Sequence, residues 1–214
     1  MIAVVCVQVG NKYPFSHVVK LKNMVARNLK IDHQFFCLTD KPKKHDGIQC
    51  IDVSTALKGW WAKMNLFNRR NMPPGRILYF DLDTVIIDDI SPLATLEVDF
   101  GICRNFTRAA GHSTYPCKYG SCVMSVGPDF GQPIWDEFDS EKERFILRCR
   151  YGDQEAIESI YPFAKVLNED LPPGFFLGYR DIKATKPPGA AVVVFAGNNK
   201  PEKYNQPWIR KAWQ

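Results

Sequence analysis

The chain has 214 residues, of which 45% are hydrophobic and 24% are charged. This composition is that of a folded globular protein and excludes a disordered chain. The length allows one substantial core but hardly two full domains, so we expect a single domain over residues 1–214. The net charge of +5 is modest and spread along the chain. A positive net charge favours an anionic ligand. The basic residues form no stripe along the sequence of the kind that indicates nucleic-acid binding.

The sequence carries no signal for a membrane or an oxidising compartment. No apolar run approaches the roughly 20 residues of a transmembrane segment. Residues 1–7 lack the basic segment and cleavage site of a signal peptide and instead predict a strand. The seven cysteines are an odd number without Cys-x-x-Cys spacing, and the histidines are too scattered for a zinc site. We therefore expect reduced thiols in a cytoplasmic protein.

The first 83 residues alternate between strand and helix patterns. Apolar runs bounded by turn residues predict strands over residues 2–9, 33–38, 48–53 and 77–80. Helical spacing predicts one helix that starts near Ser16 as its N-cap and a second over residues 60–71, stopped by the Pro-Pro-Gly at 73–75. This alternation is typical of a nucleotide-binding half with a largely parallel sheet.

The remaining residues continue the α/β pattern. Further strands are predicted over residues 100–104, 121–126, 163–167 and 190–196. Helices are predicted over residues 133–138 and 153–160, and a loop over residues 107–119. Without an internal repeat or a low-complexity segment, the whole pattern predicts one α/β domain.

An acid pair follows the apolar run that predicts the strand over residues 77–80. The run Ile77-Leu78-Tyr79-Phe80 indicates a strand buried on both faces, and it ends in Asp81-Leu82-Asp83. Side chains two apart on a strand point the same way, so both carboxylates are expected at the sheet's carboxyl edge, where open α/β sheets bind ligands. Hard oxygen ligands in that arrangement suit Mg²⁺ or Mn²⁺ carrying a nucleotide diphosphate.

Two other interpretations of the acid pair stay open. One Asp could cap a turn while the other is solvated. The pattern also resembles the first motif of haloacid-dehalogenase-like phosphatases, in which the first acid, here Asp81, is the nucleophile. Against the phosphatase, Thr84-Val85 replaces that superfamily's usual turn, and 80 residues of strand and helix pattern precede the pair.

Four further stretches carry side chains that suit a donor site. Tyr13 follows the first predicted strand and could stack on a base, and Lys63 lies one turn into the second predicted helix. Asp153-Gln154 opens a helix. The turn from Gly197 to Lys200 could aim N–H groups and an ammonium at phosphate. Taken singly, these stretches are equally typical of a surface tyrosine, an ordinary helical lysine, an N-cap and a polar turn.

In their order along the chain, these stretches resemble the family 8-type glycosyltransferases of the GT-A fold, the family of glycogenin and the bacterial lipopolysaccharide galactosyltransferases. The resemblance extends from Val4 to about Trp208, and the acid pair and Asp153-Gln154 are its most specific parts. It implies an α/β fold with a single GT-A-like domain, in which helices flank a central mixed, mostly parallel sheet. Residues 1–83 would form the nucleotide-binding half and residues 84–214 the half for sugar and acceptor.

The same resemblance implies a role for each of these residues. Asp81 and Asp83 would hold the metal, Mn²⁺ or Mg²⁺, beneath the diphosphate of the donor. Asp153 and Gln154 would be the catalytic residues nearest the sugar. The nucleotide and the rest of the donor would be bound by Val7, Gln8, Tyr13, Lys63, Asp81, Gly197 and Lys200.

Two departures from the family pattern bear on the metal and the sugar. The family usually has a histidine metal ligand in the motif of the last strand, where this chain has Val194-Phe195-Ala196-Gly197. His112 is the candidate substitute, although a lone loop histidine is more often a surface residue. The usual Asn-Ser-Gly of the sugar pocket is replaced by Gly120-Ser121-Cys122.

The resemblance therefore predicts a metal-dependent enzyme that moves a hexose from a nucleotide sugar, in the first instance a UDP-hexose, to an acceptor with retention of configuration. The acceptor, whether glycan, lipid or protein, is not indicated by the sequence. A dehalogenase-like phosphatase and a catalytically inactive sugar-nucleotide-binding protein are the alternatives.

Overall fold

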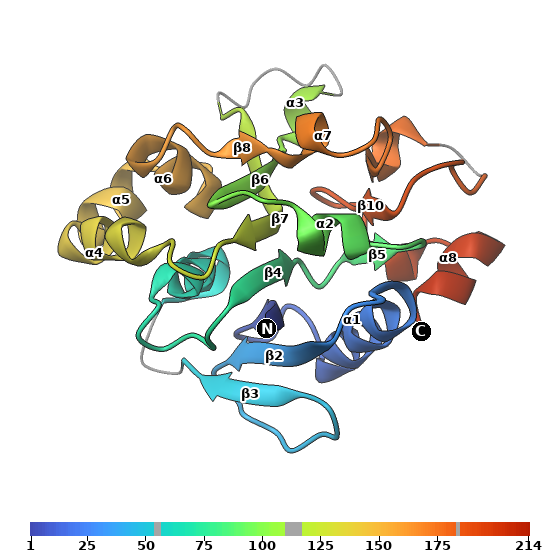
Figure 1. Ribbon diagram of the computed structural model, residues 1–214, viewed down its shortest axis with the longest axis horizontal. Coiled ribbons are helices and arrows are strands. Elements are labelled where there is room, and N and C mark those ends of the chain that lie inside the picture. Colours follow the sequence, from blue (N-terminus) through green and yellow to red (C-terminus); the bar gives the residue numbers. More distant parts are fainter. Residues whose placement is uncertain (54–56, 110–116, 183–184) are drawn as a thin grey trace.

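The computed structural model describes residues 1–53, 57–109, 117–182 and 185–214. A seven-stranded sheet forms its centre, with β3 at one edge and β8 at the other (Figure 1). In spatial order its strands are β3 (Gln49–Asp52), β2 (His33–Thr39), β1 (Ile2–Gln8), β4 (Arg76–Phe80), β7 (Tyr119–Val126), β6 (Phe100–Arg104) and β8 (Lys165–Val166).

The direction of these strands confirms the predicted mixed, mostly parallel sheet. The strands β3, β2, β1 and β4 run parallel to one another, as the strand and helix alternation of the first 83 residues predicts. The strand β7 runs antiparallel to both β4 and β6, and β8 is parallel to β6. The carboxyl ends of β1 and β4 therefore meet the amino end of β7 at one edge.

A second, three-stranded sheet joins the middle of the chain to its last part. Its order is β5 (Thr84–Ile86), β10 (Val192–Val194) and β9 (Phe176–Gly178). The pairing of Val194 with Thr84 is antiparallel, so the segment that follows β10 lies beside the segment that precedes β5. The sequence pattern did not predict β5 or β9, which have only three residues each.

Helices cover both faces of the main sheet. Figure 1 shows α4, α5 and α6 grouped at one end, and α8 beside α1. The α-helices are α1 (Phe15–Asn28), α2 (Ser91–Thr95), α3 (Phe106–Ala109), α4 (Gln132–Ser140), α5 (Lys142–Arg148), α6 (Asp153–Ile160), α7 (Leu167–Asp170) and α8 (Pro207–Ala212). The 3₁₀ helices are η1 (Gly59–Phe67), η2 (Tyr179–Asp181) and η3 (Pro201–Lys203).

Two predicted helix features are wrong. The helix α1 begins at Phe15 with Pro14 as its N-cap, and Ser16 lies inside its first turn without capping it. Proline suits this place because its fixed φ, here −69°, leads the chain into the helix and its carbonyl accepts the N–H of His17. The helix predicted over residues 60–71 is the 3₁₀ helix η1 and ends at Phe67.

The 3₁₀ helix η1 is packed against other elements over most of its surface. Most of its residues from Trp61 to Phe67 are buried, so it has no polar stripe of the kind that an amphipathic α-helix presents to water. It lies between the sheet and the helices α4 and α6. Contacts on several sides, rather than one amphipathic face, therefore hold η1 in place.

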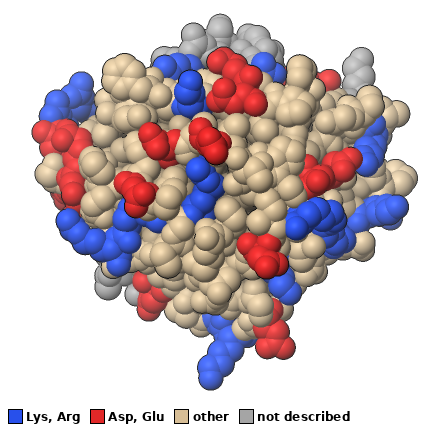
Figure 2. All heavy atoms as spheres, viewed as in Figure 1, with Lys and Arg blue, Asp and Glu red and all other residues tan. Residues whose placement is uncertain are grey.

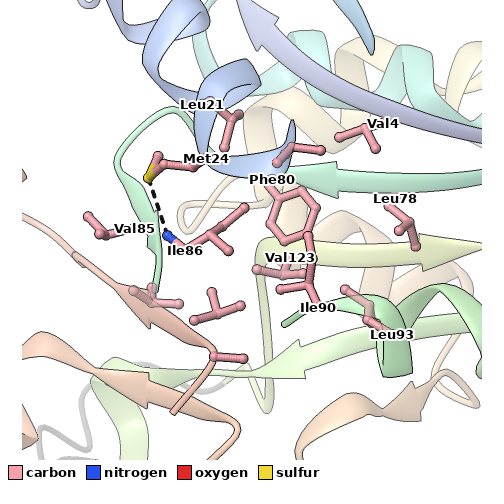
Figure 3. Close-up of a cluster of buried hydrophobic side chains, with 14 of the residues drawn as sticks. Val4, Leu21, Met24, Leu78, Phe80, Val85, Ile86, Ile90, Leu93 and Val123 are labelled. Carbon is pink, nitrogen blue, oxygen red and sulfur yellow. Dashed lines mark hydrogen bonds between the residues drawn. The ribbon is translucent and has the colours of Figure 1, made fainter. Parts of the chain in front are cut away.

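Two hydrophobic cores lie on the two faces of the sheet, as the alternation of β1 requires. Val4 and Cys6 point into the core beneath α1, α2 and the second sheet, whereas Ala3 and Val5 point into the core beneath η1, α4 and α6. Figure 3 shows part of the first core, where Phe80 is surrounded by apolar side chains from several elements. The acid pair therefore follows a strand that is fixed from both faces.

The surface and the cysteines agree with the sequence-based expectations where the structure describes them. On the face drawn in Figure 2, basic and acidic side chains are interspersed. All seven cysteines are free thiols. Among the residues described, no helix has the length and apolar character needed to cross a membrane.

Phe80 provides a test of the core that supports the acid pair. The side chain is fully buried, so Phe80→Ala is expected to lower the free energy of unfolding by about 3–5 kcal/mol, measured by urea unfolding. Phe163 is 80% exposed and is the matched control, with an expected change within about 0.5 kcal/mol for Phe163→Ala. Equal effects of the two changes would contradict the position of Phe80 in the core.

Candidate functional site

A cleft of about 690 Å³ opens where the strands β1, β4 and β10 end and where β7 begins. This is the edge at which α/β sheets bind ligands, because chain directions reverse there and leave a crevice. The structure places all ten predicted site residues around this one cleft. They are Val7, Gln8, Tyr13, Lys63, Asp81, Asp83, Asp153, Gln154, Gly197 and Lys200.

The acid pair reaches the cleft from a turn, and not from a strand as predicted. The strand β4 ends at Phe80, and the N–H of Thr84 donates to the carbonyl of Asp81 at 3.0 Å. The N–H of Asp81 donates to the carbonyl of Cys122 on β7 at 2.8 Å, which fixes the start of the turn. Both carboxylates therefore line the same cleft because of the turn, rather than because of strand alternation.

Asp83 is bound from two distant parts of the chain. The hydroxyl of Tyr13 donates to its carboxylate at 2.8 Å, and the ammonium of Lys200 forms an ion pair with the same oxygen. Burial, together with the nearby negative charge of Asp83, raises the pKa of Tyr13, so its hydroxyl remains a donor. The pairing of β5 with β10 brings Lys200 here, since Asp83 directly precedes β5.

Asp81 shares a buried ammonium with Asp153. The Nζ of Lys63 lies 3.0 Å from Oδ1 of Asp81 and 3.5 Å from Oδ2 of Asp153, and it donates to the Ser121 hydroxyl at 3.0 Å. Burial lowers the pKa of Lys63, but Asp153 and Asp81 raise it more, so the side chain stays charged. Tyr79 donates its hydroxyl to Asp81. Lys63 thus connects the acid pair to α6.

Asp153 and Gln154 lie at the first turn of α6, beside the cleft. The preceding Gly152 has φ +77°, a conformation that L side chains rarely adopt, and it turns the chain into the helix. The side chain of Asp153 is only 5% exposed, and its Oδ2 has the Lys63 ammonium as ion-pair partner but no hydrogen-bond donor. This carboxylate is therefore held by charge beside the cleft.

Gln8 lines the cleft, but its side-chain amide is engaged within the protein. Its amide donates to the carbonyl of Tyr13 at 3.0 Å, and its amide oxygen accepts the hydroxyl of Thr39 at 2.9 Å. Both ends of the buried amide are therefore engaged within the protein. In this structure Gln8 fixes the turn that carries Tyr13, while Val7 and Val9 line the cleft beside it.

Several cleft residues were missed by sequence reasoning. Lys12 directly precedes Tyr13 and Arg150 lies three residues before Asp153, so both had a local signal, whereas Arg180 on η2 is brought to the cleft only by the fold. Trp60 had a usable signal, because it lies three residues before Lys63 on a helix with three residues per turn. Among the described lining residues, five are basic and three are acidic, which suits an anionic ligand.

The carboxylates of Asp81 and Asp83 are suitable ligands for a divalent cation, but they are only two ligands. Burial raises the pKa of Asp81, Lys63 lowers it, and Asp83 raises it by repulsion, with a raised pKa as the net result. A divalent cation would relieve both the burial and the repulsion. The described residues hold no cluster of three His, Cys, Asp or Glu side chains suited to a metal. His112 lies outside the described residues.

The chain is similar to known proteins in structure but not detectably in sequence. No protein-family model matches the sequence, and no curated protein matches it either. The crystal structure of the galactosyltransferase LgtC, in complex with donor and acceptor sugar analogues, is similar with a TM-score of 0.68 and 14% identity. The match covers 99% of this chain and 91% of that one.

Two larger glycosyltransferases share the same architecture. The glycosyltransferase GlyE of Streptococcus pneumoniae TIGR4 matches with a TM-score of 0.63 and 15% identity over 95% of this chain and 57% of its own. The bifunctional glycosyltransferase WbbM matches with a TM-score of 0.61 and 13% identity over 98% of this chain and 50% of its own. At these identities the likeness concerns the fold, and it confirms that the chain has the GT-A-type fold of these glycosyltransferases.

Proposed function

We propose that this protein is a metal-dependent glycosyltransferase that moves a hexose from a nucleoside diphosphate sugar, in the first instance a UDP-hexose, to an acceptor. The observation that supports this proposal best is the meeting of the acid pair, two lysines and Asp153-Gln154 in one cleft. The GT-A-type fold adds support, because LgtC was crystallised with donor and acceptor sugar analogues. The acceptor can be a glycan, a lipid or a protein.

The donor would lie along the cleft with its base near Tyr13 and its sugar near Asp153 and Gln154. The aromatic ring of Tyr13 offers a stacking surface, and Gln8 fixes the turn that presents it. Lys200 lies against Asp83, which places an ammonium where the diphosphate would pass between base and sugar. The excess of basic over acidic side chains in the cleft favours such an anionic donor.

The reaction breaks the bond between the anomeric carbon and the diphosphate oxygen and forms a bond from that carbon to an acceptor oxygen. The proton of the acceptor hydroxyl leaves with the diphosphate or to solvent, so atoms and charge balance. Negative charge develops on the diphosphate, where Lys200 would stabilise it. A divalent ion held by Asp81 and Asp83, with further ligands from the diphosphate and water, would add Lewis acid stabilisation of that charge.

Asp153 and Gln154 would contact the sugar during transfer. The ion pair with Lys63 holds the Asp153 carboxylate beside the cleft, where the reacting carbon of the donor sugar would lie. A negative charge in that place stabilises the positive charge that develops on the sugar ring. We propose retention of configuration from the family resemblance, and product stereochemistry by NMR would test it.

A panel of sugar nucleotides with Mn²⁺ tests the proposal against its alternatives. A transferase releases nucleoside diphosphate slowly even without an acceptor. A dehalogenase-like phosphatase would instead cleave a generic phosphomonoester such as p-nitrophenyl phosphate. An inactive binder would gain thermal stability from a sugar nucleotide without turnover. The fold and the Lys63 and Tyr79 contacts to Asp81 favour the transferase.

Asp83→Asn is expected to remove most of the turnover, because the carboxylate serves the metal and the donor rather than the core. The melting temperature is expected to change by only a few degrees, since the side chain lies at the cleft. The matched control is Asp46→Asn in an exposed loop, which should keep full activity. Wild-type turnover of Asp83→Asn with Mn²⁺ supplied would show that the metal assignment is wrong.

Lys200→Ala is expected to lower kcat by about 10²–10³-fold, the range for loss of one group that stabilises developing charge. The exposed Lys44 provides the control, since Lys44→Ala removes an equal charge outside the cleft. Single-turnover measurements separate this loss from weaker donor binding. An unchanged rate for Lys200→Ala would remove Lys200 from the mechanism.

Lys63→Met is expected to remove turnover and to lower the free energy of unfolding by about 3–5 kcal/mol, because it leaves the buried Asp153 and the partly exposed Asp81 without their shared cation. The double variant Lys63→Met/Asp153→Asn should recover part of that stability without recovering activity. Urea unfolding and donor hydrolysis measure the two effects. Full stability of the single variant would contradict the role of Lys63 as the shared cation.

A further inference from the structure

One large apolar side chain is exposed inside the cleft. Trp60 is 56% exposed, and among the exposed large hydrophobic residues of the described chain it alone lines the cleft. The others, which lie elsewhere, are Met1, Ile146, Leu147 and Phe163. An indole kept in water at a ligand site is an available contact surface, because burial of its apolar area on binding is favourable.

The indole is held in place from behind. An ideal Cβ on Gly152 would lie 2.7 Å from Nε1, 2.8 Å from Cδ1 and 2.9 Å from Cε2 of Trp60, so the absence of a side chain at this position lets the ring rest against the backbone. The neighbouring Trp61 is buried and stacks on Phe138 with ring centroids 5.8 Å apart. One side of the indole is therefore backed by Gly152, and the residue that follows Trp60 is fixed in the core.

Trp60 lies at the end of the cleft that contains Asp153, away from the end that contains Asp83. Trp60 and Lys63 are three residues apart on a 3₁₀ helix and so lie on the same side of it. Lys63 pairs with Asp153, and Gly152, which backs the indole, directly precedes Asp153. Trp60 therefore adjoins the sugar end of the proposed donor, whereas Tyr13 belongs to the opposite group around Asp83.

We propose that Trp60 is the platform for a carbohydrate acceptor. This proposal rests on the proposed function, and it adds that the acceptor is a glycan whose pyranose ring stacks its apolar C–H face on the indole. Arg150 and Gln154 line the same cleft and offer polar groups to the ring hydroxyls. A flat apolar surface with polar groups at its edge suits a pyranose, which has C–H bonds on its faces and hydroxyls around its rim.

The test measures binding of simple glycosides and donor hydrolysis in the same variants. The probes are methyl β-D-galactopyranoside, methyl β-D-glucopyranoside and methyl α-D-mannopyranoside, detected by saturation-transfer NMR and titration. Trp60→Ala is expected to weaken glycoside binding about tenfold, and Trp60→Phe less than about threefold, because a smaller ring keeps part of the stacking. Acceptor-free hydrolysis of the donor is expected to fall much less than glycoside binding, because the proposal assigns the donor to Asp83, Lys200 and Asp153 and the acceptor to Trp60.

Phe163→Ala is the matched control, because Phe163 is an exposed aromatic outside the cleft and should change neither measurement. Glycoside binding that is unchanged in Trp60→Ala, or absent from the wild type for all three probes, would overturn the proposal. Equal loss of glycoside binding and donor hydrolysis, without recovery in Trp60→Phe, would also overturn it, because Trp60 would then be structural. Failure of the wild type to hydrolyse any sugar nucleotide would overturn the proposed function instead, and glycoside binding would still be measured independently.

Discussion

The site depends on one buried ammonium that two carboxylates share. Lys63 lies within 3.5 Å of both Asp81 and Asp153, which come from the turn after β4 and from the start of α6. Removing one partner of such an ion pair leaves the other charge without compensation, so the shared cation is costly to lose. The same ammonium joins two separate elements, the turn after β4 and the start of α6, at the edge of the cleft.

The second sheet determines the other half of the site. The strands β5 and β10 have three residues each, yet their pairing brings the segment after Val194 to the segment before Thr84. That approach places Lys200 on Asp83, although 117 positions separate them in the chain. Tyr13 completes this group from the turn after β1. Three segments that meet at one sheet edge thus bring a phenol, an ammonium and a carboxylate together, in agreement with the general position of ligand sites in α/β sheets.

The two lysine–aspartate pairs divide the cleft into ends with different chemistry. The group around Asp83 combines an aromatic ring with an ammonium, and the group around Asp153 combines a carboxylate, an amide and the exposed indole of Trp60. A base with its diphosphate suits the first end, and carbohydrate suits the second. This asymmetry gives the proposed transferase a direction for its donor.

The sequence by itself determined the strands of the first half, their largely parallel arrangement and the residue types of the site, because buried strands and acid pairs leave strong local patterns. The ten predicted residues line one cleft, although their roles remain predictions. The sequence could not show that the acid pair sits in a turn, that η1 is a 3₁₀ helix, or that Gln8 is engaged inside the protein. Only the tertiary structure decided which lysine meets which acid and which arginines join them. The physical reason is that pairing of three-residue strands and burial of η1 depend on contacts between distant segments, which no local pattern contains.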